Sequence, residues 1–307
     1  ILLFGKVAVP ATASKAPSKT QYVSCCALVK NNVRNLFVLP RKQEGSEEYE
    51  PMAKVHGEIN SMLKGPVIPK VQGASWKGKV VKRKYAFDDP SIPREETDYL
   101  KVVYDAKYPN PSEEICENGG KYFQRILGAG ASLLETFIVK RKLMGPCWIR
   151  IKNPEANGAP VSWCKLELQV VDPKNIVRLD LIESTTRAPP PVVTRAPPPV
   201  VAVSIKLKTV VNPKTHKSEI VAVSAVCHKE VNLDTASDES GRHMTHLTII
   251  RPLPNESGGI PKFPRDFEAE ASRNMPELRR ELNERALLNL LLAQIGNWDP
   301  DVICGHN

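Results

Sequence analysis

The sequence has 307 residues, of which 41% are hydrophobic and 25% are charged, an ordinary composition for a globular protein. This length is enough for about two domains that each bury a core. No apolar run reaches the length of a membrane-spanning helix. Lys and Arg number 43 against 34 Asp and Glu, and the resulting net charge of +9 suits a polyanionic partner.

The cysteines bear on the redox environment of the protein, and the chain ends bear on whether the sequence is part of a longer chain. The 7 cysteines lie mostly in apolar runs, their number is odd, and the sequence has no CxxC pair. We therefore expect reduced core thiols in an intracellular protein, not a disulfide framework or a zinc site. The sequence begins without Met and without the charged lead of a signal peptide. Both ends look cut, and we expect a fragment of a longer chain.

The first part of the chain has strand signals followed by a helix signal. Residues 2–7 predict a strand, and two further apolar runs, 22–29 and 35–39, flank the turn-forming residues Asn31 and Asn32. Two such runs around a turn predict a β-hairpin. The apolar periodicity that follows, up to Met62, predicts a helix.

Residues 76–87 (WKGKVVKRKYAF) alternate basic with apolar or aromatic side chains. A strand here would place Lys77, Lys79 and Arg83 on one face and Lys82 and Lys84 on the other. One interpretation is a solvated edge strand, because charged strands blunt edge-to-edge pairing. The other is a strand that faces nucleic acid, because basic residues beside aromatic ones suit backbone contact and base stacking. These five residues are the candidate nucleic-acid contacts.

Residues 132–143 (SLLETFIVKRKL) predict an amphipathic helix with Ser132 as its cap. The alternating runs 147–151 and 163–171 predict two strands across a turn at residues 157–160. A further strand is expected at 99–104. Residues 1–178 are therefore expected to form a strand-rich domain with one or two helices.

A duplicated segment follows, in which TRAPPPVV at 186–193 is repeated at 194–201. Its prolines favour extended polyproline II structure without a core of its own. We expect a linker over residues 179–199, and a ligand for an SH3-type domain is the alternative.

Residues 200–307 have a different pattern. Three β-rich runs at 200–207, 220–227 and 247–251 are followed by an irregular stretch at 255–273. Apolar residues then recur at helical spacing over 282–295, which predicts a helix buried on more than one side and stopped by Gly296. Asp299 and Asp301 flank a proline in a predicted turn, where they would shape the chain and not act as catalytic acids. A buried strand is predicted at 302–304, returning parallel to the first.

The helix, the DPD turn, the strand and the final Gly-His-Asn resemble the second exonuclease motif of B-family DNA polymerases. The segments LLFGKV, VSCCALVKN, FVLPR, RKLMGPCWIRIKNP and PVSWCKLE look like the N-terminal domain of the alpha branch of that family, in the same order. The resemblance covers nearly the whole chain. It implies an α+β fold class, with the strand-rich N-terminal domain followed at 200–307 by an incomplete RNase-H-like α/β domain of 3′–5′ exonuclease type.

The resemblance also implies where proofreading chemistry should be. The family holds its metal ions with an Asp-x-Glu pair on the first strand of the exonuclease domain, and that place is taken by Ser204 and Lys206. Ser is a poor sole ligand and Lys is a cation, so we expect a degenerate site with no catalytic residues and no metal. The alpha branch is known for lacking proofreading. Asn307 is the expected remnant of the second motif.

One other group of residues could suggest a metal. His243 and His246 lie close in sequence to Asp238, but no other ligand is spaced to complete a site. They adjoin a polar loop, and the solvated interpretation is the simpler one.

For the full-length parent, the resemblance implies a nuclear DNA-directed DNA polymerase, a nucleotidyltransferase of DNA replication. A DNA template and an RNA/DNA primer would bind to it, with primase and accessory polymerase subunits as partners and no membrane. Mg²⁺ would serve its polymerase domain, and this region, with no cofactor of its own, would be scaffold and template-side contact. The alternatives are an active metal-dependent 3′–5′ exonuclease domain and a basic, β-rich nucleic-acid-binding module unrelated to polymerases.

Overall fold

The structure is a computed structural model that describes residues 1–9, 21–70, 75–85, 89–180, 196–231, 244–254, 261–275 and 277–305. The chain forms two compact units. One consists of Ile1–Leu3, Ala27–Asn157 and Leu168–Val193, and the other of Phe4–Cys26, Gly158–Glu167 and Thr194–Asn307. The units therefore interleave along the chain, and the consecutive division expected from composition stays a prediction. Most of the proline-rich repeat, residues 181–195, lies outside the described residues.

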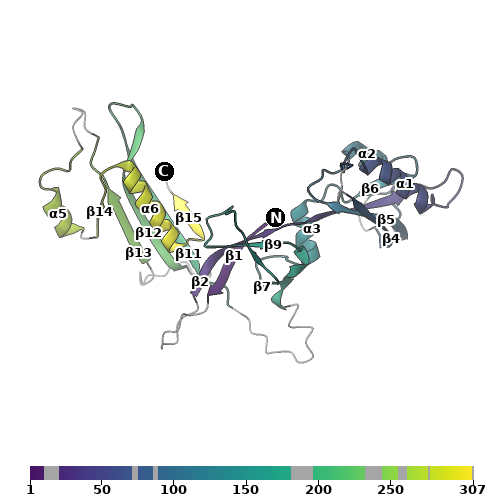
Figure 1. Ribbon diagram of the computed structural model, residues 1–307, viewed down its shortest axis with the longest axis horizontal. Coiled ribbons are helices and arrows are strands. Elements are labelled where there is room, and N and C mark those ends of the chain that lie inside the picture. Colours follow the sequence, from purple (N-terminus) through teal and green to yellow (C-terminus); the bar gives the residue numbers. More distant parts are fainter. Residues whose placement is uncertain are drawn as a thin grey trace, which may run out of the picture. The chain divides into compact units, whose positions relative to one another are not determined.

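The main sheet of the first unit is a four-stranded antiparallel sheet with the strand order β4-β5-β3-β6. Its strands are β3 (Val33–Pro40), β4 (Trp76–Lys84), β5 (Glu96–Asp105) and β6 (Phe123–Leu127). Helix α1 (Met52–Leu63) connects β3 to β4, and α2 (Glu113–Asn118) connects β5 to β6. The chain order β3-α1-β4-β5-α2-β6 with this strand order is the split βαβ arrangement of ferredoxin-like folds. Figure 1 shows both helices beside this sheet.

Period-2 alternation gives this sheet one apolar face. Leu36 and Val102 lie opposite each other on that face, and both are buried. Helix α1 covers them with Val55, Ile59 and Leu63, which are spaced four residues apart and therefore share one side of the helix. Both α1 and α2 contribute to this core, so they pack on the same face of the sheet. The predicted helix ending at residue 62 and the predicted strand at 99–104 are confirmed.

A second core in the first unit forms around α3 (Leu133–Arg141), whose Phe137 packs with Ala27, Val29 and Ile176. The side chain of Ser132 accepts a hydrogen bond from the Glu135 backbone, and the Glu135 carboxylate accepts one from the Ser132 backbone. This capping box confirms the predicted cap. The short strands β7 (Ile149–Ile151) and β10 (Ile176–Arg178) pair antiparallel, with the 3-10 turn Pro173–Asn175 before β10.

A further sheet has the order β1-β2-β9-β8, formed by β1 (Leu2–Val9), β2 (Gln21–Val29), β9 (Leu166–Val170) and β8 (Glu155–Ala156). This pairing corrects one prediction and refines another. The runs around Asn31 form strands but not a hairpin, because β2 and β3 belong to different sheets. Strands do pair across residues 157–160, but the strand before that turn is β8, which pairs antiparallel with β9, while the predicted run at 147–151 contains β7, which pairs with β10. A local turn signal was present at Asn31 too, and distant partners determined the pairing there.

The second unit contains a five-stranded sheet with the order β14-β13-β12-β11-β15. Its strands are β11 (Val200–Val211), β12 (Ser218–Val231), β13 (Met244–Ile250), β14 (Arg279–Arg280) and β15 (Val302–Gly305). Strand β12 pairs antiparallel with both β11 and β13. Strand β15 returns parallel to β11, as predicted. Helix α6 (Glu284–Trp298) packs Leu287 and Leu291 onto this sheet against Val203, Val223 and Ile249 (Figure 1).

The end of the chain differs from expectation in several details. Helix α6 passes through Gly296 and ends at Trp298, and the capping residue Asp299 adopts the left-handed conformation with φ of 52°. Its burial is one-sided, because Leu292 is 49% exposed. Strand β15 forms but is exposed, with Ile303 at 54%. The stretch expected to be irregular contains α5 (Phe267–Asn274). No helix among the described residues is long and apolar enough to span a membrane.

Candidate functional site

Strand β4 carries the five candidate nucleic-acid contacts and lies at one edge of its sheet. Its register with β5 shows that they face two ways, as the alternation predicted. Lys82 lies opposite Asp98 and Lys84 opposite Glu96, so each has an acidic cross-strand neighbour. Opposite charges across a strand pair attract, and this half of the strand is close to charge-balanced.

The other three candidates lie on the face of the sheet opposite α1 and α2. Lys79 is opposite Lys101 of β5, and Lys101 is opposite Phe37 of β3, so these three side chains form one row across the sheet. Lys77 and Arg83 flank that row on β4. We call Lys77, Lys79, Arg83, Lys101 and Phe37 the basic sheet face. Like charges directly opposite are destabilising, and Lys79 and Lys101 are such a pair.

Phe37 lies between positive charges. The Nζ of Lys101 and the guanidinium carbon of Arg83 are each 5.9 Å from the centre of its half-buried ring. Burial lowers the pKa of Lys140 on α3, and the positive charge of Lys101 lowers it further, so another cation lies near this row. No ion pair joins any cation of the basic sheet face to an acid within the described part of the chain.

One end of the face that carries the basic sheet face is covered by apolar side chains. Leu39, Ile92 and Tyr99 form a small buried cluster there, with Phe37 at its margin. Next to it Arg125 forms an ion pair with Asp89. Beside this cluster lies the row of Lys79, which is exposed, and of Lys101 and Phe37, which are partly buried; α3 also contacts β3. Sequence analysis missed Lys101 and Phe37, although Lys101 is the one charged residue in the run YLKVVY.

The two aspartates of the DPD turn use their carboxylates as structural acceptors. Asp299 accepts hydrogen bonds from the backbone N–H and the hydroxyl of Ser24, at 2.8 and 2.5 Å. Asp301 lies 2.6 Å from the Nζ of Lys6, a side chain that is only 7% exposed, and accepts from the backbone of Val201. The prediction that these residues shape a turn fits this geometry.

The family model for the exonuclease domain of DNA polymerase family B matches residues 124–307, which is more than half of the chain. The chain belongs to DNA polymerase family B. It is 34% identical to the DNA polymerase alpha catalytic subunit of Xenopus laevis, over 100% of this chain and 19% of that protein. The corresponding identity is 34% for the Leishmania donovani subunit and 32% for that of Arabidopsis thaliana, each over 100% of this chain and 20% of the relative. The chain thus spans about a fifth of the length of these relatives, and the expected family is confirmed.

Within this family B chain, β11 is the strand expected to carry metal ligands. Ser204 and Lys206 are exposed on one face of it. Their cross-strand neighbours are Val226 and Cys304 for Ser204, and Ser224 for Lys206, none of which has a carboxylate. Mg²⁺ prefers carboxylate and other oxygen ligands, and a lysine ammonium repels it. These residues do not fit a divalent metal ion.

The remaining metal candidates are only partly visible. Asn307, His243 and Asp238 lie outside the described residues, and His246 lies on β13 opposite Val226. Among the residues that the structure describes, no group of three or more His, Cys, Asp or Glu side chains could hold a metal ion.

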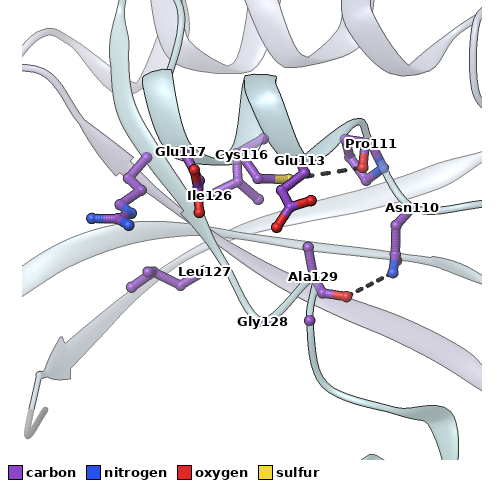
Figure 2. A pocket seen from close by; sticks show the side chains of 11 residues that line it. Asn110, Pro111, Glu113, Cys116, Glu117, Ile126, Leu127, Gly128 and Ala129 are labelled. Atoms are coloured by element: carbon purple, nitrogen blue, oxygen red, sulfur yellow. Dashed lines mark hydrogen bonds between the residues drawn. The ribbon is translucent and has the colours of Figure 1, made fainter.

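The family B chain also has a pocket of about 470 Å³ beside α2 and β6 (Figure 2). Two of its polar groups are already bonded. The Asn110 amide donates to the carbonyl of Ala129 at 2.6 Å, and the Cys116 thiol lies 3.9 Å from the carbonyl of Pro111. Burial raises the pKa of Cys116, which makes it a poor nucleophile. The geometry assigns no chemistry to this pocket.

Proposed function

We propose that this chain is a non-catalytic part of a replicative DNA polymerase catalytic subunit, acting as scaffold and template-side nucleic-acid contact. The observation that carries the proposal is that Ser204 and Lys206, at the position where the family resemblance leads us to expect metal-binding carboxylates, are exposed on one face of β11 and have no carboxylate among their cross-strand neighbours. Family membership and the similarity to alpha catalytic subunits support the polymerase parent. That parent would extend RNA/DNA primers on a DNA template in the nucleus, with primase, accessory subunits and Mg²⁺.

Electrostatics argue against proofreading by this sheet. At an effective dielectric of about 20, two unit charges about 4 Å apart interact by about 4 kcal/mol, and a divalent ion doubles that value to about 8. Lys206 is exposed and can turn away, which reduces the repulsion. About 1.4 kcal/mol is enough for a tenfold loss of metal occupancy, so even a small remainder of the repulsion matters.

The test is release of 3′ nucleotides from labelled single-stranded DNA by the purified 307-residue chain with Mg²⁺ or Mn²⁺. We expect no metal-dependent release, because two-metal cleavage requires several carboxylates to hold the ions and orient water. The matched variant carries Ser204→Ala with Lys206→Ala and is expected to behave like the wild type.

The alternative is an active metal-dependent 3′–5′ exonuclease, which the match to an exonuclease-domain model favours. Metal-dependent release by the wild type that disappears in the Ser204→Ala, Lys206→Ala variant would establish that alternative. Release that is equal in both proteins would point to a nuclease contaminating both preparations.

A further inference from the structure

We propose that the basic sheet face is a platform for single-stranded nucleic acid. Phe37 would stack on an unpaired base, while Lys79, Lys101 and Arg83 would contact the phosphates on either side. The inference rests on the proposed template-side role and gives that role a nucleic-acid class and a set of residues.

The position of the face in the sheet is the first argument. Both α1 and α2 pack on the opposite side, against Leu36 and Val102, so neither covers the row that contains Phe37. Four-stranded sheets of βαββαβ proteins that bind single-stranded RNA stack bases on aromatic residues of the sheet. This arrangement alone is only an analogy, because a fold does not determine a function.

The charges of the face supply the second argument. Lys79 and Lys101 lie directly opposite each other, which disfavours the folded state unless an anion lies between them. Lys82 and Lys84, on the same strand, each have an acidic residue opposite. One strand thus has a charge-balanced side and a side with surplus positive charge. The aromatic rings on the first side, Trp76 and Tyr104, pack with the core beneath α1, whereas Phe37 lies on the second side among the cations.

The aromatic ring of Phe37 favours single-stranded nucleic acid over a duplex as the ligand. Phe37 is half-buried in the sheet surface, with a cation 5.9 Å from its centre on β4 and another on β5. An unpaired base can stack on such a ring, and stacking tolerates any base because each has a π face. Bases in a duplex already stack on one another, and a duplex would use only the charges.

The test compares two pairs of substitutions on β4 that remove equal charge. Lys79→Gln with Arg83→Gln alters the basic sheet face, and Lys82→Gln with Lys84→Gln alters the opposite side. Binding of the whole chain to labelled oligo(dT) is measured by fluorescence anisotropy over a series of salt concentrations. Single-strand binding has a slope of log affinity against log salt of about −0.7 per phosphate contact, so the first pair should flatten the slope by about 1.4. The second pair should leave the slope unchanged.

Phe37→Leu tests stacking separately. Leu retains an apolar side chain beside the Leu39 cluster, and thermal melts of all variants confirm that they are folded. We expect this variant to bind oligo(dT) about 5- to 150-fold more weakly, the range given by the loss of one stacked base, with the salt slope unchanged. Its affinity for a duplex of the same length should stay the same.

The outcomes distinguish failure of the single-strand platform from failure of the template-side role on which it rests. If both charge pairs flatten the slope equally, the assignment to the basic sheet face is wrong, while the template-side role remains. If the wild type binds neither single-stranded nor duplex DNA at low salt, the template-side role fails and the platform with it. Loss of single-strand affinity in Phe37→Leu, together with a flatter slope only for Lys79→Gln with Arg83→Gln, supports the platform.

Discussion

Arg251 is a buried cation whose two shortest side-chain contacts are with the beginning of β12. Its side chain is 5% exposed, and its guanidinium lies 2.6 Å from the carboxylate of Glu219 and 2.7 Å from the carbonyl of Ile220. Asn212 donates a second hydrogen bond to Glu219 at 2.6 Å. These hydrogen bonds, the one from Asn212 above all and then that from Arg251, lower the pKa of Glu219. The carboxylate therefore stabilises the folded state only while it is ionised.

Glu219→Gln should lower the free energy of unfolding at neutral pH by about 1–3 kcal/mol, because it leaves Arg251 without its counter-charge. The folded pKa of Glu219 is below its ordinary value of 4.5. Its contribution is therefore complete above pH 4.5 and is lost as the pH falls through the folded value. Denaturant melts over a pH series should show the two proteins converging in acid.

The control for that series is Glu268→Gln. Glu268 pairs with Arg280 at 3.1 Å, but its side chain is 62% exposed, and exposed ion pairs contribute about 1 kcal/mol at most. Equal effects of the two substitutions at neutral pH, or a difference that persists in acid, would contradict the role assigned to Glu219.

Among the elements, the turn between α6 and β15 connects three strands by its side chains and backbone. The Asp301 carboxylate contacts Lys6 of β1 and accepts a hydrogen bond from the backbone N–H of Val201 of β11, and the backbone N–H of Asp301 donates to the carbonyl of Val201. Lys6 also donates to the carbonyl of Pro199 at 2.7 Å. The turn therefore fixes the start of β11 as well as its own strand.

Asp301→Asn should lower the free energy of unfolding by about 1.5–3 kcal/mol, the range for hydrogen bonds to charged groups, because Lys6 is nearly buried. In a double-mutant cycle with Lys6→Met, the two losses should not add, since either substitution alone removes the same ion pair. If the losses of unfolding free energy from the two substitutions add, the ion pair between Asp301 and Lys6 contributes no interaction energy to stability.

Elements with local determinants could be predicted from sequence, and elements with distant ones could not. The cap at Ser132 depends on Glu135 three residues later, so the sequence contains the whole motif. Strand β3, by contrast, pairs with β5, in a register that sets Val33 opposite Asp105. Nothing in the sequence near the Asn31 turn indicates this partner. Gly296 has a helix propensity about 1 kcal/mol worse than Ala, and the helix continues through it. Packing of Trp298 against the core beneath α6 gives a reason.

The candidate site was predictable to the same extent. Alternation alone separated Lys79 and Arg83 from Lys82, because the faces of a strand follow from its period of two. Phe37 and Lys101 come from other strands, and only the sheet register brings them into the row of Lys79. Ser204 and Lys206 were assigned to a degenerate metal site from their position in the family's motif. Their neighbours on adjacent strands could not be predicted, because the sequence of one strand does not show which residues pair with it.

Over the whole molecule, the two units have separate hydrophobic cores. The core of the first unit surrounds Leu36 and Val102, and that of the second surrounds Val203 and Leu287, with no residue in common. Opening of a protein proceeds through cooperative segments, and segments with separate cores can open independently. The basic sheet face belongs to the first unit and the five-stranded sheet to the second, so a change in one is expected to leave the other folded.

A matched pair of core substitutions tests this independence. Leu36 and Leu287 are 1% and 0% exposed, so Leu36→Ala and Leu287→Ala should each cost about 2–5 kcal/mol in the core they alter. Hydrogen exchange followed by mass spectrometry should then show faster exchange for Leu36→Ala in α1, β3 and β5, and for Leu287→Ala in α6, β11 and β12. Leu292→Ala, at a position that is 49% exposed, is the control and should change little. Faster exchange across both sets of elements in either core variant would mean that the two cores unfold as one cooperative unit, because loss of one core would then expose the other.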